Sequence, residues 1–402
     1  MNKITIIGGG AAGFFAAITC AEKNPAAEII ILERGKEVLQ KVKISGGGRC
    51  NVTHACFDPK ELCEYYPRGK KELLGPFHQF MTGDTMQWFE DSGVALKIEA
   101  DNRVFPVSNS SQSIIDVLIN ATEKLGIKVK LNHRVENFEK VGGLWKINTN
   151  KGDFIADKLL IASGSNTKIW EMLNNLDHTI VPPVPSLFTF KINDKRIREI
   201  PGISVPNATV SIANSTFETS GPLLITHWGM SGPAVLKLSA FGARFLAKKD
   251  YHYNVVINWL SKQTEQIFEK LKTIRTAHKK KQVILKSVFQ EIPKRLWENL
   301  VLASEIKNES RWADVSNKQL ENLSNQLTKG IFNANGKSTF KEEFVTAGGI
   351  DLKEVNFKRF ESKLHKNLFF AGEVLNIDAV TGGFNFQNAW TGGYIAGNVM
   401  AE

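Results

Sequence analysis

The glycines near the start of the chain have the spacing of a phosphate-binding turn. Gly8, Gly10 and Gly13 form a G-x-G-x-x-G motif between an apolar run at residues 3–7 and an alanine-rich stretch at residues 11–22. The run predicts a buried strand and the stretch a helix, so the motif lies in a strand-to-helix turn. Gly8 permits the tight turn, Gly10 lets a pyrophosphate approach the backbone, and Gly13 lets the helix pack on the strand. The positive end of the helix then favours the phosphates.

An acidic residue follows at the distance that this motif requires. Residues 28–32 predict a second strand, and Glu33 comes directly after it. A carboxylate there accepts hydrogen bonds from both hydroxyls of a ribose and repels a 2′-phosphate. A glycine-rich turn without a ligand is the alternative, but strand, motif, helix and acid together favour a dinucleotide site. The motif alone does not separate NAD from FAD.

A second glycine cluster begins at Ser45 and runs Gly46-Gly47-Gly48-Arg49-Cys50-Asn51, with Lys41 and Lys43 just before it. Three consecutive glycines expose backbone N–H groups and admit close contact with a flat or anionic group, and Arg49 can pair with a phosphate. An ordinary loop is the alternative. Because the cluster follows a dinucleotide motif, we expect it to form a second wall of the same site.

Small residues end two further predicted strands. Residues 157–165 predict a strand that ends in the small residues Ala162, Ser163 and Gly164. Such residues can lie under a nucleotide; a turn that merely ends the strand is the alternative. Residues 367–371 are followed by Gly372 and Glu373.

The last part of the chain predicts contacts to a sugar chain and a planar ring. Asp378 can bind polyol hydroxyls, and the Gly382-Gly383 turn brings backbone against a ring. A helix expected to begin near Gln387 directs its positive end at that ring, where it would stabilise a developing negative charge. A dinucleotide with a ribityl chain and a reducible ring accounts for this cluster, which NAD does not need.

Six motifs in this order resemble those of a bacterial family of FAD flavoproteins. They are KITIIGGGAAG with Glu33, SGGGRCN, THWGMSGP (226–233), TAGGI (346–350), FAGE (370–373) and TGGFNFQNAW (381–390) after Asp378. Members carry labels such as aminoacetone oxidase, 3-dehydro-bile-acid Δ4,6-reductase and NAD(P)/FAD-dependent oxidoreductase. The resemblance implies an α/β fold: a glutathione-reductase-like FAD-binding Rossmann domain interrupted by a β-barrel insert and a small helical domain.

The resemblance also implies which residues hold the cofactor, FAD. The first glycine motif and Glu33 would bind its ADP half, while the second cluster and the GGFNFQ turn would flank the isoalloxazine ring. The full set of expected cofactor contacts is Gly8, Gly10, Ala11, Ala12, Gly13, Glu33, Arg34, Lys41, Ser45, Gly46, Gly47, Gly48, Arg49, Cys50, Asn51, Val135, Ala162, Ser163, Gly164, Gly372, Glu373, Asp378, Gly383, Phe384, Asn385 and Gln387.

Few side chains are expected to take part in chemistry, since a flavin performs its own redox reaction. His227 precedes a Ser-Gly-Pro helix start and is a candidate proton donor near a cleft between insert and FAD domain; a structural histidine is the alternative. Cys50 is a second candidate, expected to pack against the ring. A redox dithiol of Cys50 and Cys56 is disfavoured, because Cys56 precedes a turn and not a helix. No Cys or His spacing is typical of a metal site.

The elements that must position these residues divide into five segments. We expect the FAD-binding domain at 1–186 and 346–402, a barrel at 187–262 and 330–345, and a helical insert at 263–329. Three prolines at residues 182–185 predict a stiff crossing into the insert. Runs at 187–192, 208–212, 223–226 and 253–257 predict barrel strands, with a return at 337–344, and spaced apolar residues at 263–327 predict short helices.

The composition limits the class of protein, its compartment and its ligands. The chain has 402 residues, 42% of them hydrophobic and 23% charged, which excludes a mostly disordered chain. The apolar stretches are too short for a membrane span, no secretory signal is expected, and four cysteines suit a reducing compartment, so we expect a cytoplasmic protein. The net charge of +10 permits anionic ligands, with basic residues spread along the chain. The densest run, residues 278–281, is a solvated face or a partner surface.

Three functions remain open. The favoured one is an FAD-dependent oxidoreductase that acts on a small molecule, by enone-type reduction or by amine or alcohol oxidation. A second dinucleotide motif is missing from the sequence, so NAD(P)H would bind only transiently, in the substrate cleft. Otherwise the substrate reduces the flavin and oxygen reoxidises it. A flavin-dependent tRNA-modifying protein is the alternative, disfavoured because no RNA-binding module is recognisable. A non-catalytic flavin-binding protein is the third. The sequence leaves substrate, direction and oligomeric state open.

Overall fold

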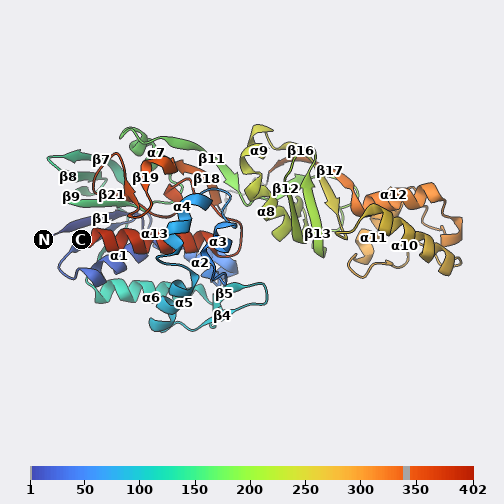
Figure 1. Ribbon diagram of the computed structural model, residues 1–402, viewed down its shortest axis with the longest axis horizontal. Coiled ribbons are helices and arrows are strands. Elements are labelled where there is room, and N and C mark those ends of the chain that lie inside the picture. The colour runs from blue at the N-terminus through green and yellow to red at the C-terminus, as the bar shows by residue number, and fades with distance from the viewer. Residues whose placement is uncertain (1, 338–344) are drawn as a thin grey trace. The chain divides into compact units, whose positions relative to one another are not determined.

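The computed structural model describes residues 2–337 and 345–402, which divide into two units (Figure 1). The first consists of Met1–Pro183 and Thr346–Glu402, and the second of Val184–Val345. The two segments that connect them, β11 (Ile180–Ser186) and β18 (Val345–Ile350), pair in a two-stranded sheet. The proline-rich crossing is therefore a strand. The finer division of the chain into five segments stays a prediction.

A seven-stranded sheet forms the centre of the first unit. Its order is β19 (Val355–Asn356), β20 (Glu361–Ser362), β21 (Leu368–Phe370), β10 (Lys158–Ile161), β1 (Lys3–Ile7), β2 (Glu28–Leu32) and β6 (Lys128–Lys130). The five strands from β21 to β6 are parallel. Their continuous apolar runs are typical of strands buried on both faces. Since β1 lies between β2 and β10, the carboxyl ends of these strands meet at the edge where α/β sheets bind ligands.

Two long helices pack against each other beside this sheet: α1 (Ala11–Lys23) and α13 (Phe384–Met400) (Figure 1). Glycine makes the close approach possible. A Cβ at Gly393 would lie 2.8 Å from the carbonyl oxygen of Ala12, and one at Gly397 would lie 2.6 Å from that of Ala16. The first and last segments of the chain therefore form one body.

The first unit contains further short elements. Its helices are α2 (Gln40–Gly48), α3 (Pro59–Cys63), α4 (Lys70–Phe77), α5 (Thr82–Asp91), α6 (Ser111–Lys124) and α7 (Thr167–Asn174), with 3₁₀ turns η2 (Leu352–Glu354) and η3 (Gly372–Val374). One small sheet has the order β3 (Thr53–His54), β5 (Arg103–Pro106), β4 (Leu96–Ile98), and another β7 (Val135–Val141), β8 (Leu144–Thr149), β9 (Gly152–Ala156).

The second unit is built on a closed barrel of antiparallel strands, as predicted. Its order is β12 (Phe190–Ile192), β15 (Gly229–Ser231), β14 (Glu218–Thr226), β13 (Ser204–Ile212), β16 (His252–Asn258) and β17 (Gly330–Lys337). The short β15 was not expected. The return strand lies at 330–337, whereas residues 338–344 of the expected return are outside the described part of the chain.

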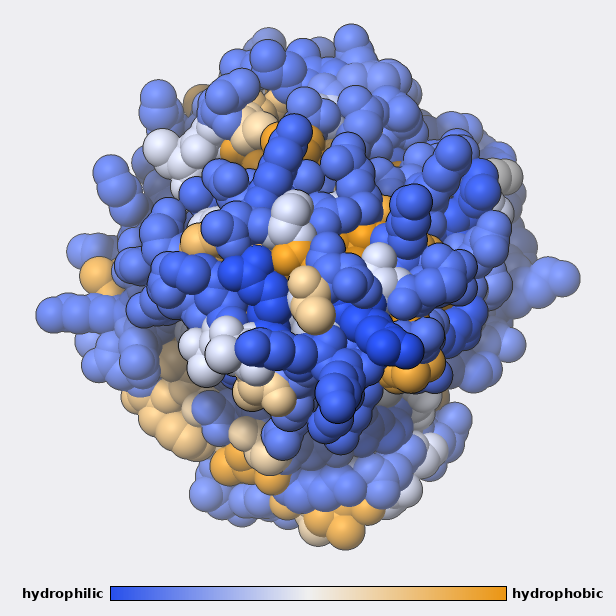
Figure 2. All heavy atoms as spheres, turned by 90° about the vertical axis from the view of Figure 1, so that its right-hand side faces the viewer, coloured by the Kyte–Doolittle hydropathy of each residue, from blue (hydrophilic) through white to orange (hydrophobic). Residues whose placement is uncertain are grey.

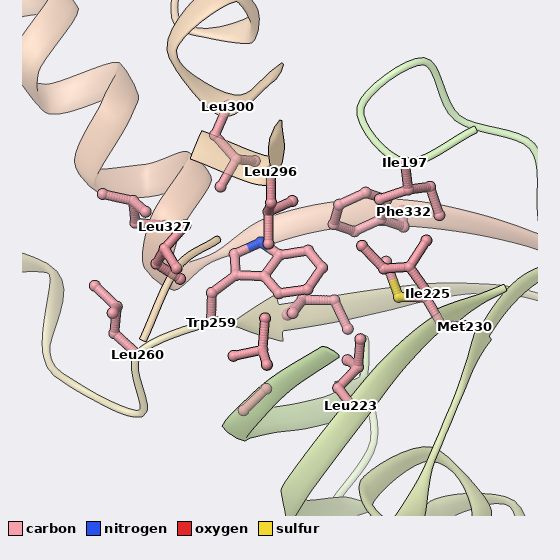
Figure 3. Packing of buried hydrophobic residues seen from close by; sticks show 14 of the residues in the cluster. Ile197, Leu223, Ile225, Met230, Trp259, Leu260, Leu296, Leu300, Leu327 and Phe332 are labelled. Carbon is pink, nitrogen blue, oxygen red and sulfur yellow. The ribbon is translucent and has the colours of Figure 1, made fainter. Parts of the chain in front are cut away.

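Helices complete this unit: α8 (Pro233–Phe241), α9 (Ala243–Lys248), α10 (Thr264–Ala277), α11 (Lys294–Ala303), η1 (Trp312–Asp314) and α12 (Asn317–Thr328). Barrel and helices share one apolar core (Figure 3). The Trp259 indole lies among barrel residues such as Leu223 and helix residues such as Leu327, and meets the Phe332 ring edge-on with centroids 5.9 Å apart. The helical segment is thus anchored to the barrel.

Candidate functional site

The first glycine turn has the three properties that its spacing predicts. Gly8 has a φ of 118°, and a Cβ there would lie 2.3 Å from the carbonyl oxygen of Ala162. A Cβ at Gly13 would lie 2.1 Å from the carbonyl oxygen of Gly8. By contrast, a Cβ at Gly10 would have no protein atom within 4 Å. The turn is closed on the sheet side and open at Gly10, where a ligand can approach the backbone.

Glu33 lies beside this turn at the end of β2. Its Oε2 accepts a hydrogen bond from the Gly9 N–H at 2.9 Å and its Oε1 accepts one from the Gly35 N–H at 2.7 Å. The backbone carbonyl of Glu33 accepts from the His133 N–H at 2.8 Å, which brings the start of β7 and its buried Val135 to the same edge. Arg34 is exposed. The carboxylate is held in place by backbone groups, and its remaining lone pairs can accept from a ligand.

The second glycine cluster ends helix α2 in an unusual conformation. Gly46, Gly47 and Gly48 have φ values of 57°, 69° and 82°. A Cβ at either of the last two would meet no atom within 4 Å. Successive backbone N–H groups in such a turn form a concave surface that suits anions or a polar ring edge. The predicted loop is therefore a kinked helix end that is open on one side.

Arg49, which was expected to pair with a phosphate, has two protein partners in this structure. Its guanidinium donates to Glu99 Oε1 at 2.6 Å and lies over the Phe105 ring, 3.9 Å from the centroid. Both partners come from the small β3–β5–β4 sheet or its turn, about 50 residues further along the chain. This pairing fixes the glycine turn against that sheet.

Cys50 is buried directly behind the turn. Burial raises the pKa of its thiol to about 12, so the thiol is neutral near pH 7 and is a poor nucleophile. All four cysteines of the chain are free thiols. Cys50 and Cys56 form no disulfide in this structure. Cys56 lies just before α3, whose N-cap is Asp58, so the expectation of a turn and not a helix after Cys56 was wrong. The burial of Cys50 suits packing rather than redox exchange.

Two buried polar atoms near these turns have no partner among the described residues: Asn51 Oδ1 and Ser163 Oγ. Asn51 is the last residue of the second cluster, and Ser163 lies between Ala162, which is close to Gly8, and Gly164. Buried polar groups are nearly always hydrogen-bonded, so unpaired ones at a predicted site are positions where a ligand would complete the bonding. Together with the open backbone at Gly10, Gly47 and Gly48, they fit a bound dinucleotide.

An ion pair joins the second cluster to the end of β21. Lys41 of α2 pairs with Glu373 of η3, and a Cβ at Gly164 would lie 3.6 Å from Glu373 Oε2. Gly372 precedes Glu373, and a Cβ at Gly372 would lie 3.3 Å from the Cβ of Ala12 in α1. Four separate segments that the sequence marked as candidates therefore lie together at the carboxyl edge of the sheet.

The C-terminal candidates have structural partners that the sequence did not indicate. The Asp378 carboxylate, expected to bind polyol hydroxyls, is fully buried and pairs with Arg68 through both oxygens. Asn385 clamps the loop before it by donating to the Ala379 carbonyl at 3.1 Å and accepting from the Ala379 N–H at 3.0 Å.

Gln387 also takes part in a buried network. Its Oε1 accepts from Thr53 and Thr85 hydroxyls at 2.6 and 3.0 Å, and its Nε2 donates to Thr391 at 3.1 Å. The helix begins at Phe384 and not near Gln387, so the expected start was wrong by one turn. Gly383 caps it with a φ of 97°, and a Cβ there would lie 2.5 Å from the Thr53 carbonyl oxygen.

A stack of aromatic rings at this helix start was missed by the sequence analysis. Phe384 lies parallel to Tyr65 with centroids 4.2 Å apart, and the His54 ring lies 4.4 Å from Phe384. His54 Nδ1 is 3.1 Å from the Gly382 carbonyl oxygen, which can only accept, so Nδ1 carries the proton. The position of His54 shortly after the glycine cluster was the one available signal.

The second unit holds the other catalytic candidate. His227 lies in the tight turn between β14 and β15, and its side chain is exposed. It therefore precedes a strand and not directly a helix. A role for His227 stays a prediction.

Two negative findings concern the described residues, 2–337 and 345–402. No group of three or more His, Cys, Asp or Glu side chains there is placed to hold a metal ion. No helix in the same ranges is long and apolar enough to cross a membrane.

Comparison with known proteins gives relatives along the whole chain. A 3-dehydro-bile acid delta(4,6)-reductase of Clostridium scindens is 27% identical, with 100% of both chains covered. Ribosomal RNA dihydrouridine synthases are 28% identical in Escherichia coli, covering 96% of this chain and 94% of that protein, and 26% identical in Haemophilus influenzae, covering 97% and 96%.

Among solved structures, a 3-ketosteroid-delta4-(5alpha)-dehydrogenase from Rhodococcus jostii RHA1 has a TM-score of 0.51 at 12% identity, over 100% of this chain and 97% of that one. This likeness confirms the predicted fold class. Residues 2–399 match the family described as HI0933-like protein Rossmann domain. The resemblance inferred from the six motifs is thereby confirmed, and the chain belongs to the HI0933-like Rossmann family.

Proposed function

We propose that this protein is an FAD-dependent oxidoreductase. The observation that carries the proposal is the meeting of four glycine-containing turns at the carboxyl edge of one parallel sheet, linked by the contacts of Gly8 with Ala162 and of Gly164 with Glu373. A mononucleotide would need only the first turn, whereas an extended dinucleotide uses the turns at both ends of the edge. The open backbone at Gly10 and Gly47 supports this cofactor.

The chain's own residues would have distinct tasks toward FAD. Gly8, Gly10 and Gly13 leave the helix start open to the pyrophosphate, and Glu33 accepts from the ribose hydroxyls. Asn51 and Ser163 would gain the hydrogen bonds that they lack. The amino end of α13, set by Gly383, would favour an electron-rich ring through its partial positive charge. When bound, the flavin supplies hydride transfer.

The names of the relatives support one reaction class for this proposal. A delta(4,6)-reductase and a dihydrouridine synthase both saturate a carbon–carbon double bond conjugated to a carbonyl group. We propose the same class here: hydride delivered to the β-carbon of a conjugated carbonyl compound, followed by a proton at the α-carbon. His54 and His227 are the candidate proton donors, and NADH or NADPH the transient reductant.

Two substrate classes are compatible with this reaction, a small-molecule enone and a uracil base in RNA. The distribution of charge favours the second. The second unit contains 24 Lys and Arg against 14 Asp and Glu, a net charge of +10, whereas the first unit contains 27 of each. The RNA-modifying relatives also weaken the expectation that disfavoured nucleic acid as a partner. The four free thiols are compatible with the proposed cytoplasmic location.

The test is anaerobic reduction followed by product analysis. The purified protein, loaded with FAD, is mixed with NADH or NADPH and the flavin spectrum is followed. A steroid enone and a uridine-containing RNA are then offered separately, and products are examined by mass spectrometry. We expect the flavin to bleach and one substrate to gain two hydrogen atoms. A flavin that neither nicotinamide reduces, with no hydrogen gained, would remove the reductase proposal.

A further inference from the structure

The whole net charge of the molecule belongs to the second unit, and part of it is concentrated where two chain segments lie side by side. Residues 278–283 follow α10, and residues 307–313 precede α12. Gln282 forms an isolated antiparallel bridge with Arg311. The Trp312 N–H donates to the Lys281 carbonyl at 3.0 Å and the Ala313 N–H donates to that of Lys279 at 3.1 Å.

We term the basic cluster the three lysines of the first segment, Lys279, Lys280 and Lys281, together with Lys307 and Arg311 of the second. All five residues are exposed. The backbone beneath them is fixed, because Val283 and Trp312 are buried and the Trp297 indole donates to the Val283 carbonyl at 2.9 Å. The cluster is thus a surface of the folded unit and not a charged tail.

The basic cluster differs from other basic residues of the same unit because its side chains form no ion pair with a described carboxylate. Lys262, Lys272 and Lys294 each have a carboxylate partner, at 3.9, 3.0 and 3.6 Å. None of the five cluster side chains has one among the described residues. Glu309 is the carboxylate within these segments. Asp314 follows directly after them and accepts from the Arg311 backbone N–H at 3.0 Å. A local excess of positive charge remains.

We propose that the basic cluster is a binding surface for the phosphate backbone of RNA. The inference rests on the proposed function in its RNA form, since it assigns the second unit the task of holding the polymer. Unpaired lysines on a fixed surface neutralise successive phosphates and release counterions, which gives strong salt dependence. The cluster contains no apolar side chain, so it lacks the hydrophobic anchor with which an amphipathic surface inserts into a membrane. Hydrophilic side chains cover most of the face seen in Figure 2.

The experiment measures RNA binding by the full-length protein directly. A fluorescein-labelled single-stranded RNA of about 20 nucleotides with several uridines is titrated by anisotropy at a series of KCl concentrations. The test variant is K279Q/K280Q/K281Q. The matched control is K124Q/K151Q/K168Q, which removes the same charge from exposed positions of the first unit. The variant K279R/K280R/K281R keeps the charge.

We expect the test variant to bind at least about tenfold more weakly and its plot of log Kd against log salt to be shallower by about 2, because three phosphate contacts are lost. The control and the arginine variant should bind like the unchanged protein. Equal weakening of test and control variants, or no RNA binding by the unchanged protein, would overturn the proposal. Binding to phosphatidylserine vesicles in place of RNA would also overturn it.

Flavin content and reduction by NADPH are recorded on the same preparations. If the flavin is reduced but RNA is not bound, this inference fails and the oxidoreductase stands. If RNA binding depends on the lysines but no flavin is bound, the binding surface stands and the proposed function fails.

Discussion

Gly10 differs from Gly8 and Gly13 in what an added side chain would meet, and this difference separates ligand binding from folding. A Cβ at Gly10 meets no protein atom within 4 Å, so Gly10→Val should fold with nearly unchanged thermal stability. The valine would occupy the path of the pyrophosphate. We expect FAD affinity to fall by roughly 100-fold, equivalent to about 3 kcal/mol, in a titration followed by flavin fluorescence.

The control is Gly8→Val. Its φ of 118° and the 2.3 Å approach to Ala162 predict loss of folded protein and not of affinity alone. Unchanged FAD binding by a folded Gly10→Val protein would contradict the assignment of the first turn.

The thiols give a second prediction for single residues. Burial raises the pKa of Cys50 to about 12 and that of Cys63 to about 11, so neither is a thiolate near pH 8. Ellman's reagent should react slowly with the native protein and should detect four thiols after denaturation. Rapid labelling of Cys50, or a disulfide with Cys56 in the isolated protein, would restore the dithiol hypothesis.

The glycine positions could be predicted because their roles depend on local backbone geometry. The spacing of Gly8, Gly10 and Gly13 already predicts that the backbone packs closely at Gly8 and Gly13 and stays open at Gly10. The partners of Arg49 and Asp378 could not be predicted in the same way. Glu99 and Arg68 lie about 50 and 310 residues away along the chain, and no local pattern marks either one.

At the scale of elements, the contact between α1 and α13 depends on glycine. Gly397→Ala should destabilise the protein by about 1–3 kcal/mol, because its Cβ would lie 2.6 Å from the Ala16 carbonyl oxygen. This steric cost exceeds the gain of about 1 kcal/mol that alanine brings to a helix. Urea unfolding measures the difference.

Gly83 in α5 offers a matched comparison, since a Cβ there would meet only the Phe57 ring, at 4.0 Å. Gly83→Ala should stabilise the protein by about 0.5–1 kcal/mol. If both substitutions stabilise, the tight packing of α1 on α13 is refuted.

Elements with a strong apolar pattern were predictable, and those defined by pairing were not. The runs at 3–7 and 28–32 form β1 and β2 as expected, because consecutive apolar residues suit strands buried on both faces. The three-residue β15 is too short to have a period. The start of α13 was misplaced because Phe384 follows a glycine with positive φ, a conformation that sequence does not display.

At the scale of the whole molecule, a buried histidine links stability to pH. His178 shares hydrogen bonds with Glu354 Oε2 at 2.8 Å and with the Ser362 hydroxyl at 3.0 Å, and the His365 ring lies 5.8 Å away. Burial lowers the pKa of His178, although Glu354 opposes this effect. Burial raises the pKa of Glu354, but hydrogen bonds from Thr179 and His178 outweigh it, so the net pKa is lowered.

The sign of the pH dependence follows from the lowered pKa of His178. The unfolded chain binds a proton at this residue near pH 6.5, where the folded protein does not. The free energy of unfolding should therefore be highest above pH 7 and decrease as pH falls through about 6.5 toward the folded pKa. Urea unfolding between pH 5 and 8 measures it. His178→Gln should reduce this slope and exposed His78→Gln should not; equal slopes in all three proteins would contradict the account.

The identity and amount of flavin bound to the purified protein test the central claim most directly. The absorption spectrum is recorded, the protein is denatured, and the released flavin is identified and quantified against the chain. The arrangement of the glycine turns predicts a flavin spectrum and one FAD per chain. A colourless protein that takes up no added FAD would contradict it.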